Sequence, residues 1–247
     1  MRKITISLII LISICIGCYY YYENKKTEVI ISGKVIGFDI PNVEENSKNN
    51  KLVKTSTKSI GTITFIKEDS HEFSALGHSI SQLNNNINLN GNCYNINFDS
   101  IERASSNTAG KIIANINQDE KIGLLNSCNQ YGIYGKIENI KQNFQKIKTE
   151  NRFNIQKGEA YILLDLDNQG LKKYDVQVEE INYLFPNQNI RIKVTSEELI
   201  KISGGIVQGM SGAPLVQNGK LIGAINCVNI NNSLDAYAIF IDKLLNV

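Results

Sequence analysis

From residue 61 onward, the sequence is a succession of short apolar runs separated by turn-forming residues. Residues 61–66, Gly-Thr-Ile-Thr-Phe-Ile, alternate between polar and apolar side chains, which is the pattern of a half-buried strand. Many short strands at such spacing are typical of a β-barrel or sandwich, so we predict an all-β domain. Further strand-like runs lie at residues 87–89, 93–98, 110–116, 132–137, 160–166, 174–178, 190–194, 215–224 and 236–241, and short helical periods at 196–202 and 239–245.

Composition excludes several classes of protein. The 247 residues are 42% hydrophobic and 20% charged, which suits one packed domain, or two small ones, rather than a disordered chain. The net charge is only +2, from 26 basic and 24 acidic residues. This balance gives no electrostatic basis for binding nucleic acid, so we expect none.

The N-terminus carries an apolar stretch over residues 4–22, preceded by Arg2 and Lys3 and ending in four tyrosines. A stretch of this length can span a bilayer as a helix, and its positive end should stay cytoplasmic. We predict a signal anchor over residues 1–26, with the rest of the chain outside the cytoplasm. A cleaved signal peptide, for which no clear cleavage site follows, and lipidation at Cys18 are the alternatives.

The remaining chain divides in two. Residues 29–40 are strand-forming, and residues 41–59 are polar and typical of a loop or linker. We therefore divide the chain into an anchor (1–26), a strand and linker (27–58) and a main domain (59–247). None of the three cysteines that lie beyond the apolar stretch has the spacing of a zinc ligand, and we expect no metal or cofactor. The body of the chain holds Cys93, Cys128 and Cys227, of which one pair, such as Cys93 and Cys128, could form a disulfide.

Residues 209–214, Gly-Met-Ser-Gly-Ala-Pro, carry the clearest chemical signal. Flanking glycines allow a tight turn that exposes the Ser211 hydroxyl and can aim the amides of Gly209 and Ser211 at one point, as an oxyanion hole. Asn218-Gly219 then predicts a two-residue hairpin turn between two strands. This layout is that of the nucleophile turn in chymotrypsin-like serine proteases.

A serine nucleophile needs a general base, and the chain has only two histidines. His78 follows Ala-Leu-Gly just after a predicted strand, where a histidine can be held at the edge of a barrel. His71 lies in a charged turn and is better interpreted as solvated. We therefore predict His78 as the base of Ser211, in the chain order of chymotrypsin.

These residues together resemble the SpoIVB peptidase family (stage IV sporulation protein B). The resemblance rests on residues 75–78, Ala-Leu-Gly-His, and residues 204–212, Gly-Gly-Ile-Val-Gln-Gly-Met-Ser-Gly, and it extends over about 29–40 and 59–247. It implies a chymotrypsin-like double β-barrel serine endopeptidase, with His78 and Ser211 as catalytic residues. It also implies a sporulation protease in the forespore intermembrane space that cleaves a membrane-bound regulator.

Two departures from the family are visible. Residues 41–58 are too short for the PDZ domain that members usually carry between anchor and peptidase. The family's acidic triad residue falls at Ser196, which cannot stabilise an imidazolium as a carboxylate does. Glu197, Asp165 or Asp175 could substitute for this acid, or the enzyme could work with a catalytic dyad. Glu197 could also have only a structural role, as a residue in the first turn of a short helix. A catalytically impaired, peptidase-like regulatory module is the alternative function.

Overall fold

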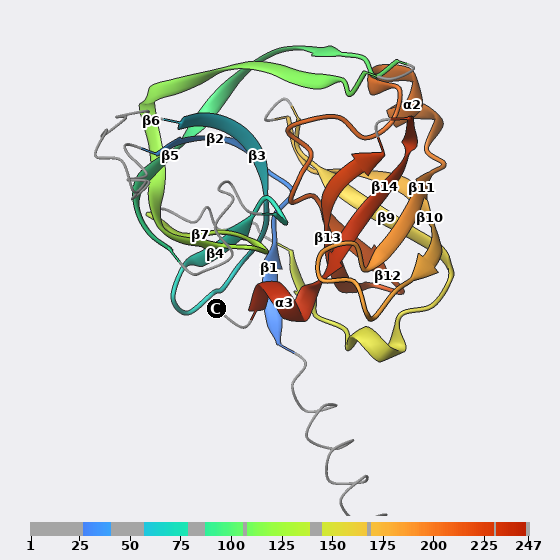
Figure 1. Cartoon of the computed structure of the whole chain (residues 1–247). Helices are drawn as coiled ribbons and strands as arrows, with labels where there is room; N and C mark the ends of the chain where they lie inside the picture. Colours follow the sequence, from blue (N-terminus) through green and yellow to red (C-terminus); the bar gives the residue numbers. More distant parts are fainter. Residues whose placement is uncertain are drawn as a thin grey trace, which may run out of the picture.

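The structure is a computed structural model, which describes residues 27–40, 57–78, 87–105, 108–138, 145–166, 169–229 and 231–245. Its secondary structure is almost entirely β and forms two barrels that lie side by side (Figure 1). The predicted all-β class and the double barrel are therefore confirmed. The predicted transmembrane segment lies outside the described residues. Within the described residues, no helix has both the length and the apolar character needed to cross a bilayer.

The first barrel closes because one strand pairs on both of its edges. β2 is hydrogen-bonded to β3 and to β5, which completes the ring β2-β5-β6-β7-β4-β3. β1 and β8 extend this sheet from β3. Segment 27–40 is thus part of the first barrel, although the sequence division placed it outside the main domain. The strands are β1 (Glu28–Ile31), β2 (Val35–Ile40), β3 (Thr57–Ile66), β4 (Glu72–Ala75), β5 (Ile87–Glu102), β6 (Lys111–Asn129), β7 (Gly132–Ile137) and β8 (Lys146–Lys148).

The second barrel is a closed ring of six antiparallel strands in the order β10-β11-β14-β13-β12-β9. The predicted turn at Asn218-Gly219 joins β12 to β13, and both residues have positive φ, as a two-residue hairpin loop of this kind requires. The strands are β9 (Gly158–Leu164), β10 (Lys172–Ile181), β11 (Ile190–Val194), β12 (Pro214–Gln217), β13 (Lys220–Asn229) and β14 (Asn232–Phe240).

In the part of the chain that the structure describes, three short helical elements accompany the barrels. The 3-10 turn η1 (Arg152–Asn154) leads from the first barrel into the second. The helix α2 (Glu197–Ser203) follows β11, and α3 (Ile241–Leu245) follows β14. Figure 1 shows α2 and α3 at opposite ends of the second barrel, and these ends are called the α2 end and the α3 end below.

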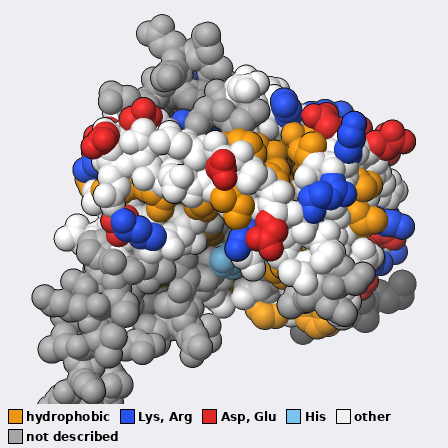
Figure 2. Space-filling view, turned by 90° about the horizontal axis from the view of Figure 1, so that it is seen from above, with side chains coloured by type: hydrophobic (Ala, Val, Ile, Leu, Met, Phe, Trp, Pro, Cys, Tyr) orange, Lys and Arg blue, Asp and Glu red, His pale blue; other side chains and the backbone are white. Residues whose placement is uncertain are grey.

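Apolar side chains fill each barrel and the junction between them. One cluster lies within the first barrel, around Phe38 and Phe73, and a larger one within the second, around Tyr174 and Phe240. A third cluster combines residues from both barrels with Leu244 of α3. The two barrels therefore share buried apolar surface, which favours a fixed relative placement. On the face seen in Figure 2, basic and acidic side chains are interspersed, without a large basic patch of the kind that nucleic acid requires.

None of the cysteines of the described chain forms a disulfide. Cys93 on β5 and Cys128 on β6 are buried, and Cys227 on β13 is half-buried. The disulfide that the sequence left open is therefore absent. Burial raises the pKa of the Cys93 thiol to about 12, so it stays protonated at neutral pH.

Candidate active site

Ser211 lies in the turn between α2 and β12, at the point where the second barrel meets the first. Gly209 and Gly212 on either side have φ of +99° and +94°, in the region that favours glycine. A Cβ on Gly212 would lie 2.0 Å from the carbonyl oxygen of Thr62, so no larger residue fits there. The Gly212 amide donates a 2.7 Å hydrogen bond to the Ile225 carbonyl, which fixes the turn on β13.

Two threonines of the first barrel hold this turn from the other side. The Thr62 hydroxyl donates to the Gly209 carbonyl at 2.8 Å, and the Thr64 hydroxyl donates to the Gly212 carbonyl at 2.7 Å. The Thr62 amide also donates to the Ser211 carbonyl at 2.8 Å. Both threonine side chains are fully buried. Buried hydrogen bonds stabilise the fold most, because their loss leaves polar groups unpaired away from water. The backbone around Ser211 is thus positioned by both barrels.

The two amides predicted to form an oxyanion hole are available. Among the described residues, neither the Gly209 nor the Ser211 amide donates a hydrogen bond. A cleft of about 550 Å³ opens beside Gly209 and could receive part of a peptide. That the two amides converge on one carbonyl oxygen remains a prediction. The cleft is lined by Lys58, Ser59, Ile60, Lys111, Ile112, Ala114, Asn115, Ile116, Gln208 and Gly209.

His78 directly follows a sharp turn after β4. Leu76 and Gly77 have φ of +73° and +67°, and for the buried leucine this is a strained conformation. Position 77 has no room for a side chain, since a Cβ there would lie 2.5 Å from the Ile225 carbonyl oxygen. The turn therefore packs directly against β13 of the second barrel, and His78 itself is half-buried.

Asn226 connects the serine turn to the histidine turn. Its main-chain carbonyl accepts a 3.3 Å hydrogen bond from the Ser211 hydroxyl. Its side-chain amide donates to the Gly77 carbonyl at 2.7 Å. Because Gly77 precedes His78, the two residues predicted to do chemistry are both held by the same buried asparagine of β13.

Ser196, the position where the family's acid is expected, is the N-cap of α2. Its hydroxyl accepts a 3.3 Å hydrogen bond from the Leu199 amide, and its own amide donates to the Asp175 carbonyl. Serine and aspartate are equally suited to such a cap. A serine at this position therefore caps α2 as an aspartate would.

The other candidate acids have similar surroundings. Glu197 and Glu198 are exposed in the first turn of α2, where carboxylates favour the helix dipole. Asp175 is exposed and forms an ion pair with Lys173, and the Asp165 carboxylate accepts from the Gly170 amide. None of these contacts of the carboxylates involves His78. The identity of a third triad residue thus stays open.

Sequence reasoning missed three residues that position the site. Thr62 and Thr64 share one face of β3, as residues two apart on a strand do, and both are buried. The available signal in the sequence was the pair of threonines that alternate with apolar residues. Asn226 gave no such signal, because its side chain contacts Gly77 in the other barrel and its carbonyl contacts Ser211 in a separate turn of its own barrel. Such contacts depend on the tertiary arrangement of the chain.

A model of the family described as SpoIVB peptidase S55 matches residues 45–245 of this chain. A comparison with curated proteins found no match. The family match begins after β2, covers every described strand from β3 onward, and includes His78, Ser196 and Ser211.

Several solved structures are similar to this one. The HtrA-type protease AlgW with a tripeptide is 14% identical, with a TM-score of 0.46 over 88% of this chain and 59% of that chain. AlgW with a decapeptide is 13% identical, with a TM-score of 0.46 over 87% of this chain and 63% of that chain. The chain thus spans about three fifths of the AlgW chains. Rv3671c from M. tuberculosis H37Rv, in an inactive form, is 9% identical, with a TM-score of 0.40 over 85% and 84% of the two chains.

Proposed function

The chain belongs to the SpoIVB peptidase S55 family, and from that membership we propose that it is a serine endopeptidase with Ser211 as nucleophile and His78 as general base. The observation that carries the proposal is the double contact of Asn226, which holds the Ser211 hydroxyl and the turn before His78. A glycine-flanked serine without chemical function would not require this connection between barrels.

The reaction begins with attack of the Ser211 hydroxyl oxygen on the carbonyl carbon of the scissile peptide, while His78 accepts the hydroxyl proton. The amides of Gly209 and Ser211 stabilise the negative charge on the former carbonyl oxygen. His78 then protonates the leaving amine, and water hydrolyses the acyl-enzyme by the same steps. The hydroxyl now donates to the Asn226 carbonyl at 3.3 Å, longer than the usual 2.7–2.8 Å of such a bond, so releasing it for attack costs little.

We also propose where the enzyme works. The apolar residues 4–22 would tether it to a membrane, with both barrels outside the cytoplasm. Family membership supports a role in sporulation signalling, in the forespore intermembrane space, with a membrane-bound regulatory protein as substrate. No metal, cofactor or nucleic acid has a part in this mechanism.

A fluorophosphonate probe tests the catalytic proposal on the full chain in mild detergent. We expect the wild type to be labelled, Ser211→Ala to be unlabelled, and His78→Gln to be labelled far more slowly. His71→Asn is the matched control, because it removes the other histidine at a position with φ of 60° that asparagine tolerates. A folded wild type without labelling would contradict the proposal and support the impaired regulatory module instead.

A further inference from the structure

Four large apolar side chains are exposed together at the α3 end of the second barrel. Phe153 is 67% exposed, Tyr183 45%, Leu184 92% and Phe185 53%. Three of them lie in the loop between β10 and β11, and Phe153 lies in η1. These four residues are called the apolar edge below. An exposed apolar group of this size commonly marks a contact surface.

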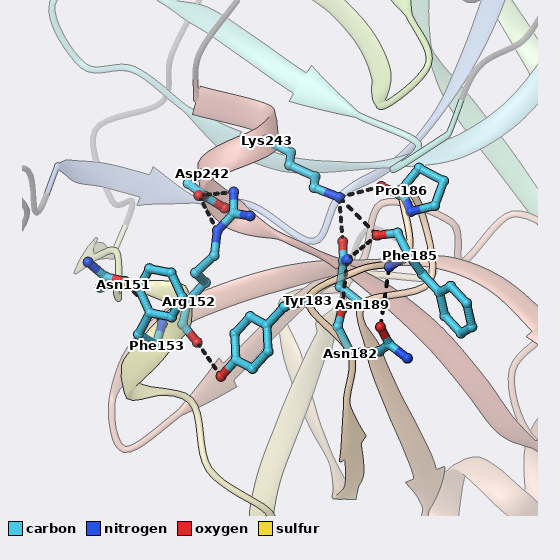
Figure 3. A network of polar contacts seen from close by, with 10 residues as sticks. All are labelled: Asn151, Arg152, Phe153, Asn182, Tyr183, Phe185, Pro186, Asn189, Asp242 and Lys243. Atoms are coloured by element: carbon cyan, nitrogen blue, oxygen red, sulfur yellow. Dashed lines mark hydrogen bonds and ion pairs between the residues drawn. The ribbon is translucent and has the colours of Figure 1, made fainter.

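Hydrogen bonds order the loop between β10 and β11 with these side chains exposed (Figure 3). The Asn182 side-chain oxygen accepts from the amides of Leu184 and Phe185 at 2.9 and 3.2 Å. The fully buried Asn189 side chain donates to the carbonyls of Asn182 and Phe185 at 3.1 and 2.6 Å. Lys243 of α3 donates to the Asn189 side-chain oxygen at 2.8 Å. The exposure of Leu184 is thus a property of an ordered loop.

Aromatic contacts connect the loop to η1. The rings of Phe153 and Tyr183 stack with centroids 5.5 Å apart, and Tyr183 stacks in turn on Phe240 at 5.6 Å. The Tyr183 hydroxyl donates to the Arg152 carbonyl at 3.4 Å. Phe153 and the loop therefore form one continuous surface, although about thirty residues separate them in sequence.

The apolar edge lies near the point where the N-terminal segment joins the first barrel. Thr27 and Thr149 exchange hydrogen bonds of 2.9 and 3.1 Å. Phe153 follows Thr149 by four residues, so their Cα atoms are at most about 15 Å apart. Similarly, Thr27 follows Tyr22, the end of the apolar stretch, by five residues, a span of at most about 18 Å. A domain on so short a tether has to hold its Thr27 side close to the bilayer.

We propose that the apolar edge rests in the interfacial layer of the bilayer to which residues 4–22 tether the chain. This inference depends on the tether in the proposed function. Phenylalanine, tyrosine and leucine are the side chains that enter this layer, which is about 5–8 Å deep on each side of the hydrocarbon. Contact at this surface fixes the orientation of the barrels as well as their distance from the membrane. The helix α2, which precedes the serine turn in sequence, lies at the opposite end of the second barrel (Figure 1).

The sequence contains no tryptophan, so a single introduced tryptophan reports its own surroundings. We would compare Leu184→Trp with Leu171→Trp in the full chain, reconstituted into phosphatidylcholine vesicles with and without brominated acyl chains. Leu171 is a matched control, since it is an exposed leucine that precedes β10 while Leu184 follows it. The ten residues of β10 lie between the two positions, and a strand of this length is at most about 33 Å long. We expect brominated lipid to quench the fluorescence of the Leu184→Trp variant and to leave that of the Leu171→Trp variant unchanged.

The outcomes separate this inference from the tether. If the chain does not float with vesicles, both the tether and the surface contact are wrong. If it floats and the two variants respond alike, only the surface contact is wrong. An emission shift of the Leu184→Trp variant that follows protein concentration without lipid would identify a second copy of the chain as the occupant and overturn the proposal. None of these readouts depends on peptidase activity.

Discussion

The side-chain amide of Asn226 donates a 2.7 Å hydrogen bond to the carbonyl oxygen of Gly77, the residue that precedes His78. Because both groups are buried, the bond is screened little by water and fixes the histidine turn against β13. The Asn226 carbonyl accepts from Ser211, so a shift of β13 would move both catalytic candidates. Asn226 is therefore a positioning residue for the proposed reaction.

Replacing this side chain should slow the chemistry. We expect Asn226→Ala to leave the Gly77 carbonyl unpaired in a buried site, at a cost of about 1–3 kcal/mol. If about 1.4 kcal/mol of this cost is added to the activation free energy of the labelling reaction, the rate of fluorophosphonate labelling falls roughly tenfold. Labelling rates measured as a function of pH would also show whether the apparent pKa of the base has moved.

Gln217→Ala is the control for Asn226→Ala. Gln217 is another buried amide of the second barrel, and its side chain donates to the Gln156 carbonyl at 2.8 Å, away from Ser211. It should lower the free energy of unfolding by a similar amount and leave the labelling rate unchanged. Equal labelling rates for Asn226→Ala and Gln217→Ala would mean that Asn226 has only a structural role.

Ser196 gives a second prediction, because the helix cap is satisfied by serine or aspartate whereas a catalytic acid requires a carboxylate. As an N-cap, Ser196→Asp keeps the hydrogen bond to Leu199 and changes the free energy of unfolding by less than about 0.5 kcal/mol, whereas Ser196→Ala costs about 1 kcal/mol. Neither should change the labelling rate. Urea unfolding and probe labelling of the two variants check this. A marked rise in labelling for Ser196→Asp would show instead that the missing acid limits catalysis.

Much of the fold could be predicted because it follows from local pattern. Runs predicted at 132–137 and 190–194 coincide with β7 and β11, and the Asn218-Gly219 turn is in place. The prediction divided β5, which is a single long strand that includes both 87–89 and 93–98, because polar residues interrupt its apolar pattern. Long strands that pair in a hairpin keep their ladder through such interruptions, and no local pattern in the sequence reveals this.

The site was predictable only in part. Glycine-flanked Ser211 and the Gly77-His78 turn carry their own signals, since each needs a backbone that favours glycine. The support from Thr62 and Asn226 comes from contacts across about 150 residues of sequence, which depend on how the barrels meet. A carboxylate for His78 could not be chosen from spacing, because several acids fit equally well.

Gly212 offers a third prediction about the junction of the barrels. A methyl group there would clash with the Thr62 carbonyl at 2.0 Å, and the residue has φ of +94°. We expect Gly212→Ala to lower the free energy of unfolding by about 3 kcal/mol or more and to abolish labelling. Gly219→Ala is the control, since its φ is also positive but no atom lies within 4 Å of the added methyl. It should cost only about 1 kcal/mol. Similar urea midpoints for the two variants would contradict the clash.

The last prediction concerns the ion pair of Glu150 and Lys220, which joins the segment after β8 to the start of β13. Burial alone would raise the pKa of the Glu150 carboxyl. Hydrogen bonds from Lys220, from the Asn151 amide and from Asn154 outweigh this effect, and the pKa is lowered overall. A lowered carboxyl pKa stabilises the folded state above the unfolded pKa of about 4.3, and this contribution is lost as the pH falls through the folded value.

Glu150→Gln should therefore lower the free energy of unfolding at pH 7, and its difference from the wild type should shrink below about pH 4. Urea unfolding between pH 7 and pH 2 measures this directly. Lys220→Met should show the same pH dependence, because it removes the donor that favours the charged form. In the double variant, the two losses should not add, since either substitution alone already breaks the pair. A constant difference across this pH range would show that the loss comes from packing of the side chain and not from its charge.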